Sequence, residues 1–187
     1  MMIRVPGKQD GFSLIELVVG LVITAIALAL LSSVFFSNPG RSVEPILQIR
    51  ATEFGQALMD EILAKKFDHN TPEGGLPACT AASCSAALGS EEGGDRSLYN
   101  DVDDYNDYCD NTAPYQNLED AAGVDLSLSS DNFSNFSMSV CVVYDADYNG
   151  VADGAPGNAK LITIDIYPPA GAGLSGAITF SAYKGNY

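Results

Sequence analysis

A long apolar run near the amino terminus constrains the fold of this chain most strongly. Residues 12–36 form a stretch of 25 residues in which Glu16 is the only charged side chain. As an α-helix, which rises about 1.5 Å per residue, this stretch is long enough to cross a hydrocarbon core of roughly 30 Å. A carboxylate inside such a span costs about 2.5–3.5 kcal/mol on insertion scales. Glu16 therefore indicates a function at that position; the alternative is an acid near the membrane surface that stays hydrated.

A short polar leader precedes the apolar run. It carries Arg4 and Lys8, and few basic residues follow soon after the run, so the positive-inside rule predicts a cytoplasmic leader and a soluble part outside the cytoplasm. An ordinary secretory signal has its cleavage site after the apolar region. Here the possible cut at Gly11 lies before that region, so the span would remain in the mature protein.

Gly11, Phe12 and Glu16 together resemble the class III signal of type IV pilins and type II secretion pseudopilins. The resemblance implies that a prepilin peptidase cuts between Gly11 and Phe12 and that the new terminal amine of Phe12 is N-methylated. It also implies that the carboxylate of Glu16 pairs with that amine on a neighbouring subunit during filament assembly. The implied partners are this peptidase, other pilin subunits and an inner-membrane assembly platform.

The remainder of the chain is long enough for one globular domain. Of the 187 residues, we expect 1–11 to be the leader peptide, 12–37 the transmembrane or filament-core helix, and 42–187 a periplasmic or extracellular domain of about 150 residues. The formal net charge is −15. A surface of that sign repels phosphate backbones, so we expect no nucleic-acid partner.

The spacing of apolar residues predicts a second helix packed on a sheet. Residues 38–40 should interrupt the first helix, because their proline removes a backbone donor. Apolar residues then recur every three or four positions over about 43–67, the pattern of an amphipathic helix. They are Leu47, Ala51, Phe54, Leu58 and Ile62. Segments 136–144, 160–167 and 177–183 are rich in β-formers, which predicts three antiparallel strands.

The expected fold class is therefore α+β and pilin-like. A long N-terminal helix, half membrane span and half amphipathic, would pack on a small antiparallel sheet with long disulfide-pinned loops. Residues 68–131, rich in Gly, Asp, Asn and Ser, predict a connecting region with turns. Within it, residues 100–107 carry four acids. We expect a solvated loop edge there; the alternatives are a cation site, or a loop that its tyrosines anchor to the sheet.

Four cysteines lie in the part expected outside the cytoplasm, where disulfides form. Four cysteines allow three pairings. We favour Cys79 with Cys84, which closes a small loop, and Cys109 with Cys141, which ties a long loop to a strand. The alternative is a zinc site, for which the spacing lacks a CxxC pair and His69 is the only histidine.

Residues 145–153 match an oxygen-ligand loop of the D-x-D-x-N-G form, and calcium is the one cofactor that the sequence suggests. The candidate ligands are the side chains of Asp145, Asp147, Asn149 and Asp153 and the carbonyl of Val151. The twelfth position is Pro156, so the glutamate of an EF-hand is missing, and no flanking helices are predicted. The alternative is a solvated turn, in which Asp, Asn and Gly are ordinary choices.

No arrangement of residues indicates catalysis. His69 stands alone in a polar stretch, where a surface position is expected, and no serine has a base and an orienting acid nearby in motif form. We therefore expect a protein that is a substrate of an enzyme and not an enzyme itself.

A narrower resemblance concerns the type of filament. Residues 42–51, 55–63 and 100–105 resemble D-type minor pilins of mannose-sensitive haemagglutinin (MSHA) pili. This implies a low-abundance subunit that initiates or modifies a filament for surface attachment, located first in the inner membrane as a single-pass protein and then in the pilus. The alternatives are a type II secretion pseudopilin and a membrane-anchored calcium-binding domain that never polymerises.

Overall fold

A computed structural model describes residues 11, 13–36, 44–109, 115–129, 133–170, 174 and 176–187. The chain divides into two compact units, Met1–Ser42 and Val43–Tyr187, and each is described here by itself. Phe12 and the expected interruption at residues 38–40 lie outside the described residues.

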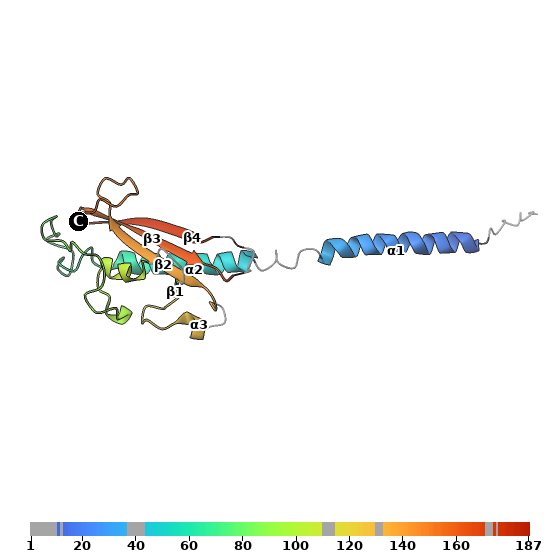
Figure 1. The fold of residues 1–187 in the computed structure, drawn as a ribbon, viewed down its shortest axis with the longest axis horizontal. Coiled ribbons are helices and arrows are strands. Elements are labelled where there is room, and N and C mark those ends of the chain that lie inside the picture. Colours follow the sequence, from blue (N-terminus) through green and yellow to red (C-terminus); the bar gives the residue numbers. More distant parts are fainter. Residues whose placement is uncertain are drawn as a thin grey trace, which may run out of the picture. The chain divides into compact units, whose positions relative to one another are not determined.

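The first unit contains the helix α1, Leu14–Phe36 (Figure 1). Its segment Leu14–Ser33 is long and apolar enough to cross a membrane by length and composition, a test that a signal sequence also passes. The hydroxyls of Thr24 and Ser33 donate to the carbonyls of Gly20 and Leu30, both at 2.8 Å. These polar groups are therefore satisfied within the helix, as an apolar surrounding requires.

The second unit begins with the helix α2, Glu44–Ala64. Leu47, Ala51, Leu58 and Ile62 are buried along one face, and Glu53, Gln56 and Asp60 are exposed on the opposite face. The predicted amphipathic helix is thus present, with its apolar stripe toward the core.

The end of α2 differs from the predicted end near residue 67. The backbone N–H of Lys66 donates to the carbonyl of Asn100 at 3.4 Å, and the N–H of Val102 donates to the carbonyl of Lys66 at 3.0 Å. Lys66 pairs with Asp101 in a parallel bridge instead of extending the helix. A tertiary contact with the loop therefore ends the helix three residues early, which the local pattern could not reveal.

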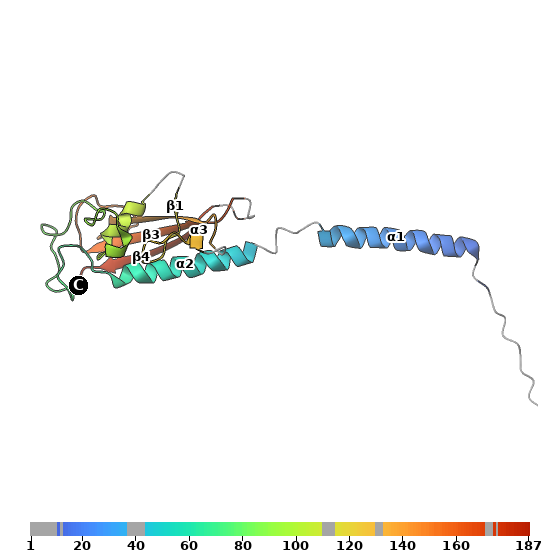
Figure 2. The ribbon, with the colours of Figure 1, turned by 90° about the horizontal axis from the view of Figure 1, so that it is seen from below.

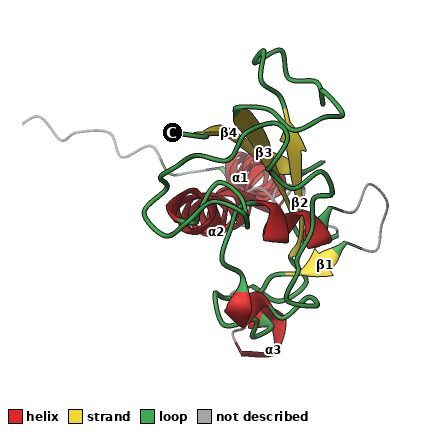
Figure 3. Ribbon diagram, turned by 90° about the vertical axis from the view of Figure 1, so that its left-hand side faces the viewer, coloured by secondary structure: helices red, strands yellow, loops and turns green. Residues whose placement is uncertain are grey.

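An antiparallel sheet in the order β1-β2-β3-β4 forms the other layer. Its strands are β1 (Gln116–Asn117), β2 (Ser137–Tyr144), β3 (Ala159–Tyr167) and β4 (Ile178–Gly185). Figure 3 shows the strands side by side with α2 next to them, and Figure 2 shows α2 running along one face of the sheet. The three predicted strands are confirmed, and the two-residue β1 is an addition inside the predicted connecting region.

The core lies between α2 and the sheet. Val140 of β2 pairs with Ile164 of β3, which pairs in turn with Phe180 of β4, and Val140 and Ile164 are fully buried. Gly55 of α2 approaches β4 so closely that a Cβ placed on it would lie 2.3 Å from Cε2 of Phe180. The helix therefore needs glycine at this point, although glycine in a helix interior costs about 0.5–1 kcal/mol relative to alanine.

The connecting region contains short elements that the sequence did not predict. They are 3₁₀ helices at Arg96–Leu98 and Asp103–Tyr108 and a short α3 at Leu126–Ser129. The segment Asp103–Tyr108 packs on β2, and Tyr99, Val102, Tyr105 and Tyr108 join the core. The α+β architecture with loops pinned by disulfides is thus present.

Candidate functional site

The processing and assembly residues lie at the start of α1. Gly11 is exposed, and Glu16 lies in the first turn of the helix with an exposed side chain. The backbone N–H groups of Glu16 and Leu17 donate to the carbonyl of Ser13 at 3.0 and 3.2 Å. An acid in the first turn is favoured by the helix dipole. Phe12, the third member of the signal, lies outside the described residues.

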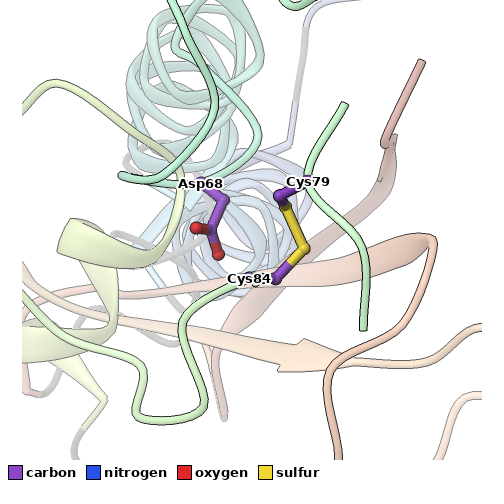
Figure 4. A group of neighbouring side chains, drawn as sticks. All are labelled: Asp68, Cys79 and Cys84. Atoms are coloured by element: carbon purple, nitrogen blue, oxygen red, sulfur yellow. A yellow bond between two sulfur atoms is a disulfide. The ribbon is translucent and has the colours of Figure 1, made fainter. Parts of the chain in front are cut away.

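The four cysteines form two disulfides, Cys79–Cys84 and Cys109–Cys141. These are the pairings that the sequence favours. Asp68 lies beside the first disulfide (Figure 4), and the three residues form a compact group of potential metal ligands. Both sulfurs are oxidised and offer no thiolate, so the zinc alternative is wrong here.

The acidic run at 100–107 is not a solvated loop edge, and that prediction is wrong. Asp101, Asp103 and Asp104 are fully buried. The reason is that this segment packs on the sheet: the amide of Val142 in β2 donates to Oδ1 of Asn106 at 3.0 Å. The tyrosine-anchor alternative is correct, because Tyr105 is also fully buried.

A buried lysine that the sequence reasoning missed neutralises part of this run. Nζ of Lys160 in β3 lies 2.5 Å from Oδ1 of Asp103 and 3.2 Å from Oδ2 of Asp68, and all three side chains are fully buried. Nζ also donates to the carbonyl of Phe67 at 2.7 Å. The alternation of β3 contained the signal, because Lys160 shares its face with the inward residues Ile162 and Ile164.

Hydrogen bonds and charge set the pKa values around Lys160. Burial alone raises the pKa of Asp68, but donors from Asn70, Ser85 and Tyr144 and the charge of Lys160 hold that pKa below its usual value. The pKa of Asp101 is raised well above its usual range, chiefly by burial and then by the neighbouring carboxylate of Asp103. Lys160 thus compensates Asp68 and Asp103 but not the whole acidic run.

Two further carboxylates, those of Glu91 and Glu92, lie close to this run. One oxygen from each of Glu91, Glu92 and Asp104 lies within 4.8 Å of the other two, and Glu91, Asp101 and the exposed His69 form a similar group. Nδ1 of His69 lies 3.8 Å from Glu91. Burial raises the pKa of Glu91, and the charge of His69 partly opposes this rise.

The loop at 145–153 brings together three of its predicted ligands. One carboxylate oxygen each from Asp145, Asp147 and Asp153 lies within 4.8 Å of the others. Oδ1 of Asn149 accepts a hydrogen bond from the amide of Val151 at 2.7 Å. The predicted calcium ligands therefore converge in part, with Asn149 bonded inside the loop.

Asp145 is the one member of this loop that is fully buried. It accepts hydrogen bonds from Tyr183 at 2.6 Å, from the amide of Gly150 at 2.8 Å and from the amide of Asn149 at 3.1 Å. Burial raises the pKa of Asp145, but these donors lower it overall. The carboxylate is thus kept ionised and oriented, which suits a turn held by its own donors as well as a cation site.

Comparisons with known proteins bear on the amino-terminal segment alone. No curated protein and no solved structure matches the chain. Residues 6–32 match the family model of the prokaryotic N-terminal methylation motif. This segment includes Gly11 and Glu16, and the apolar helix that follows fits a membrane anchor. The methylation motif, the class III prepilin signal, supports a type IV pilin-like or pseudopilin-like protein that a prepilin peptidase processes and that assembles with other pilins.

Proposed function

We propose that this chain is a minor pilin subunit of an MSHA-like type IV pilus. The observation that carries the proposal is the N-terminal methylation motif at residues 6–32. The resemblance of residues 42–51, 55–63 and 100–105 to D-type minor pilins selects the kind of filament. The subunit would help to initiate or modify a filament for surface attachment.

The two units suit the two tasks of such a subunit. The large apolar side chains of α1 are exposed within its own unit, among them Leu14, Leu21 and Leu28, so this helix needs lipid or other helices around it. The unit Val43–Tyr187 has its own core and two disulfides, as a domain outside the cytoplasm requires. The protein would lie in the inner membrane first and in the pilus afterwards.

Glu16 would specify the assembly step. In a bundle of apolar helices an unpaired carboxylate is costly, whereas a carboxylate next to an ammonium group is tolerated. Cleavage after Gly11 creates such an ammonium group on Phe12. Pairing of Glu16 with Phe12 of a neighbouring subunit would therefore fix the axial register and reject uncut precursors. The chain is a substrate of the peptidase in this proposal and not an enzyme.

Processing gives the first test. The intact mass and amino-terminal sequence are measured on membrane-extracted protein from cells with and without the prepilin peptidase. We expect a start at N-methylated Phe12 only when the peptidase is present. A start at Met1 in both strains would refute the proposal and favour a plain anchored domain.

Assembly gives the second test. Glu16→Ala should leave the protein cleaved and membrane-bound but poorly incorporated into sheared filaments. Glu53→Ala, which removes an exposed acid from α2, is the matched control and should incorporate normally. Equal incorporation of both variants would contradict the role of Glu16.

Two other functions predict different outcomes. A type II secretion pseudopilin would be cleaved at the same position, but its deletion would block secretion and leave surface pili intact. A non-polymerising calcium-binding domain is favoured by the convergence of Asp145, Asp147 and Asp153. It would remain uncut and would keep its function after Glu16→Ala.

A further inference from the structure

The carboxylates of Glu91, Glu92 and Asp104 form a group that the pilin function does not use. They come from two segments, the turn before Arg96–Leu98 and the 3₁₀ helix Asp103–Tyr108. One oxygen of each carboxylate lies within 4.8 Å of the other two. Three anionic groups at this spacing repel one another unless a positive charge lies between them.

Hydrogen bonds already hold one carboxylate oxygen of Asp104 and one of Glu92 in place. Oδ2 of Asp104 accepts hydrogen bonds from the amides of Asn100 at 2.7 Å and Asp101 at 3.0 Å. Oε1 of Glu92 accepts a hydrogen bond from Nδ2 of Asn100. These donors fix the orientation of both groups, as outer-shell hydrogen bonds fix the ligands of metal sites.

The second carboxylate oxygen of Glu92 and that of Asp104 have no hydrogen-bond partner among the described residues. Oδ1 of Asp104 and Oε2 of Glu92 are both buried without a partner, and so is Oδ1 of Asn100. Asp104 is fully buried as a residue. Buried polar atoms in native proteins nearly always have a partner, so these three unpartnered oxygens indicate a missing ligand.

The nearby basic side chains do not supply the missing charge. Nζ of Lys160 is engaged by Asp68 and Asp103. Nζ of Lys65 donates to the carbonyl of Tyr99 at 2.8 Å. His69 lies 3.8 Å from the outer carboxylate, Glu91, and is itself exposed. The missing ligand should therefore be a cation from solution.

We propose that Glu91, Glu92 and Asp104 bind a calcium ion, with Oδ1 of Asn100 as a neutral oxygen ligand and Asp101 beside it. All of these donors are oxygens, which hard cations prefer. Calcium accepts six to eight oxygens in flexible geometry, whereas magnesium requires a near-ideal octahedron and keeps much of its water. An irregular set of carboxylates and one amide therefore fits calcium better. The ion would join the turn at 91–92 to the 3₁₀ helix behind it.

Calcium binding to the full-length protein tests this site. The protein is purified in a non-ionic detergent, stripped with EDTA and titrated with calcium chloride by calorimetry. The loop at 145–153 is disabled in the background by Asp147→Asn and Asp153→Asn, so that only the new site is measured. We expect one ion per chain with a dissociation constant of about 10⁻⁴–10⁻³ M, the range of extracellular modules.

Single substitutions then locate the ion. Glu92→Gln and Asp104→Asn should each weaken binding by about 10-fold or more, by analogy with the 10–100-fold cost of disturbing a metal site. Glu53→Gln and Asp60→Asn remove the same charges from the exposed face of α2 and should leave binding unchanged. In 1 mM calcium the background protein should melt about 1–6 °C higher than in EDTA, and the two site variants should lose this increase.

Three outcomes would overturn the proposal. They are absence of calcium binding in the loop-disabled background, binding that survives Glu92→Gln, and equal competition by magnesium. Asp104 also accepts hydrogen bonds from the backbone amides of Asn100 and Asp101. Calcium binding by Asp104→Asn is therefore interpreted only if the near-ultraviolet circular dichroism of this variant is native. If Asp104→Asn unfolds, the partly exposed Glu92 decides the question alone.

Discussion

Lys160 offers the most informative single perturbation of the fold. Its ammonium group is fully buried and touches carboxylates from two distant loops, at 2.5 Å to Asp103 and 3.2 Å to Asp68. The rings of Phe67 and Tyr144 lie 4.6 and 5.0 Å from Nζ. Lys160→Met keeps most of the side-chain length and removes the charge, so it isolates the electrostatic contribution.

The expected cost follows from what the substitution leaves behind. Among the described residues, two fully buried carboxylates would lose the one cation that pairs with them, and Oδ2 of Asp103 already has no hydrogen-bond partner there. Breaking a buried ion pair by removing one partner typically costs about 3–5 kcal/mol. We expect Lys160→Met to lower the free energy of unfolding by that amount. Adding Asp68→Asn should restore part of it, because one stranded charge is removed.

The assay uses the tyrosines that surround the cluster. The chain has no tryptophan, so near-ultraviolet circular dichroism during chemical unfolding reports the buried tyrosines of the second unit. Measurements in EDTA separate this effect from the proposed calcium site. Lys184→Met is the matched control, since Lys184 faces Lys160 across β3 and β4 and its Nζ donates only one described hydrogen bond, to Leu63 O at 2.8 Å. A loss below about 1 kcal/mol for Lys160→Met, or an equal loss for Lys184→Met, would refute the electrostatic argument.

Three further predictions concern packing, cross-links and acid stability. Gly55→Ala should destabilise the protein by about 1–2 kcal/mol despite its better helix propensity, because its Cβ meets the ring of Phe180; a stabilised variant would exclude this close approach. From their sequence separations of 32 and 5 residues, loss of the Cys109 disulfide should cost about 4 kcal/mol and loss of the Cys79 disulfide about 2 kcal/mol, and the reverse order in urea midpoints would contradict the chain-entropy reasoning. Because the pKa of Asp68 is lower in the folded state, its stabilisation is complete above pH 3.8, the ordinary pKa, and is lost as the pH falls through the folded value. Asp68→Asn should therefore flatten the acid limb of a stability profile, and an unchanged slope would count against that pKa shift.

The sequence contained enough local information for the main elements of the fold. The stripe from Leu47 to Ile62 and the alternation of Ile162 and Ile164 depend on periodicity, which each segment specifies by itself. The disulfide pairing was also favoured correctly, from loop lengths. The helix and strand patterns need no knowledge of distant residues.

The buried acids could not be predicted in the same way. Asp68, Asp103 and Lys160 lie far apart in the chain, and a run of acids normally indicates a solvated surface. One local pattern indicated a buried charge: Lys160 lies on the same face of the predicted strand as Ile162 and Ile164, so its ammonium group required buried acidic partners. The early end of α2 has the same cause, since Lys66 pairs with Asp101 from a remote loop.

The close approach of α2 to β4 has a consequence for biosynthesis. In the chain, 125 residues separate Gly55 from Phe180, which the ribosome adds in roughly 6–25 s at about 5–20 residues per second. During that interval the part of the helix face that packs on β4 has no strand to cover it. Glu53, Gln56 and Asp60 on the opposite face must keep the nascent segment soluble until the last strand emerges. A chain interrupted before β4 would leave this part of the helix face uncovered, open to proteases and to neighbouring nascent chains.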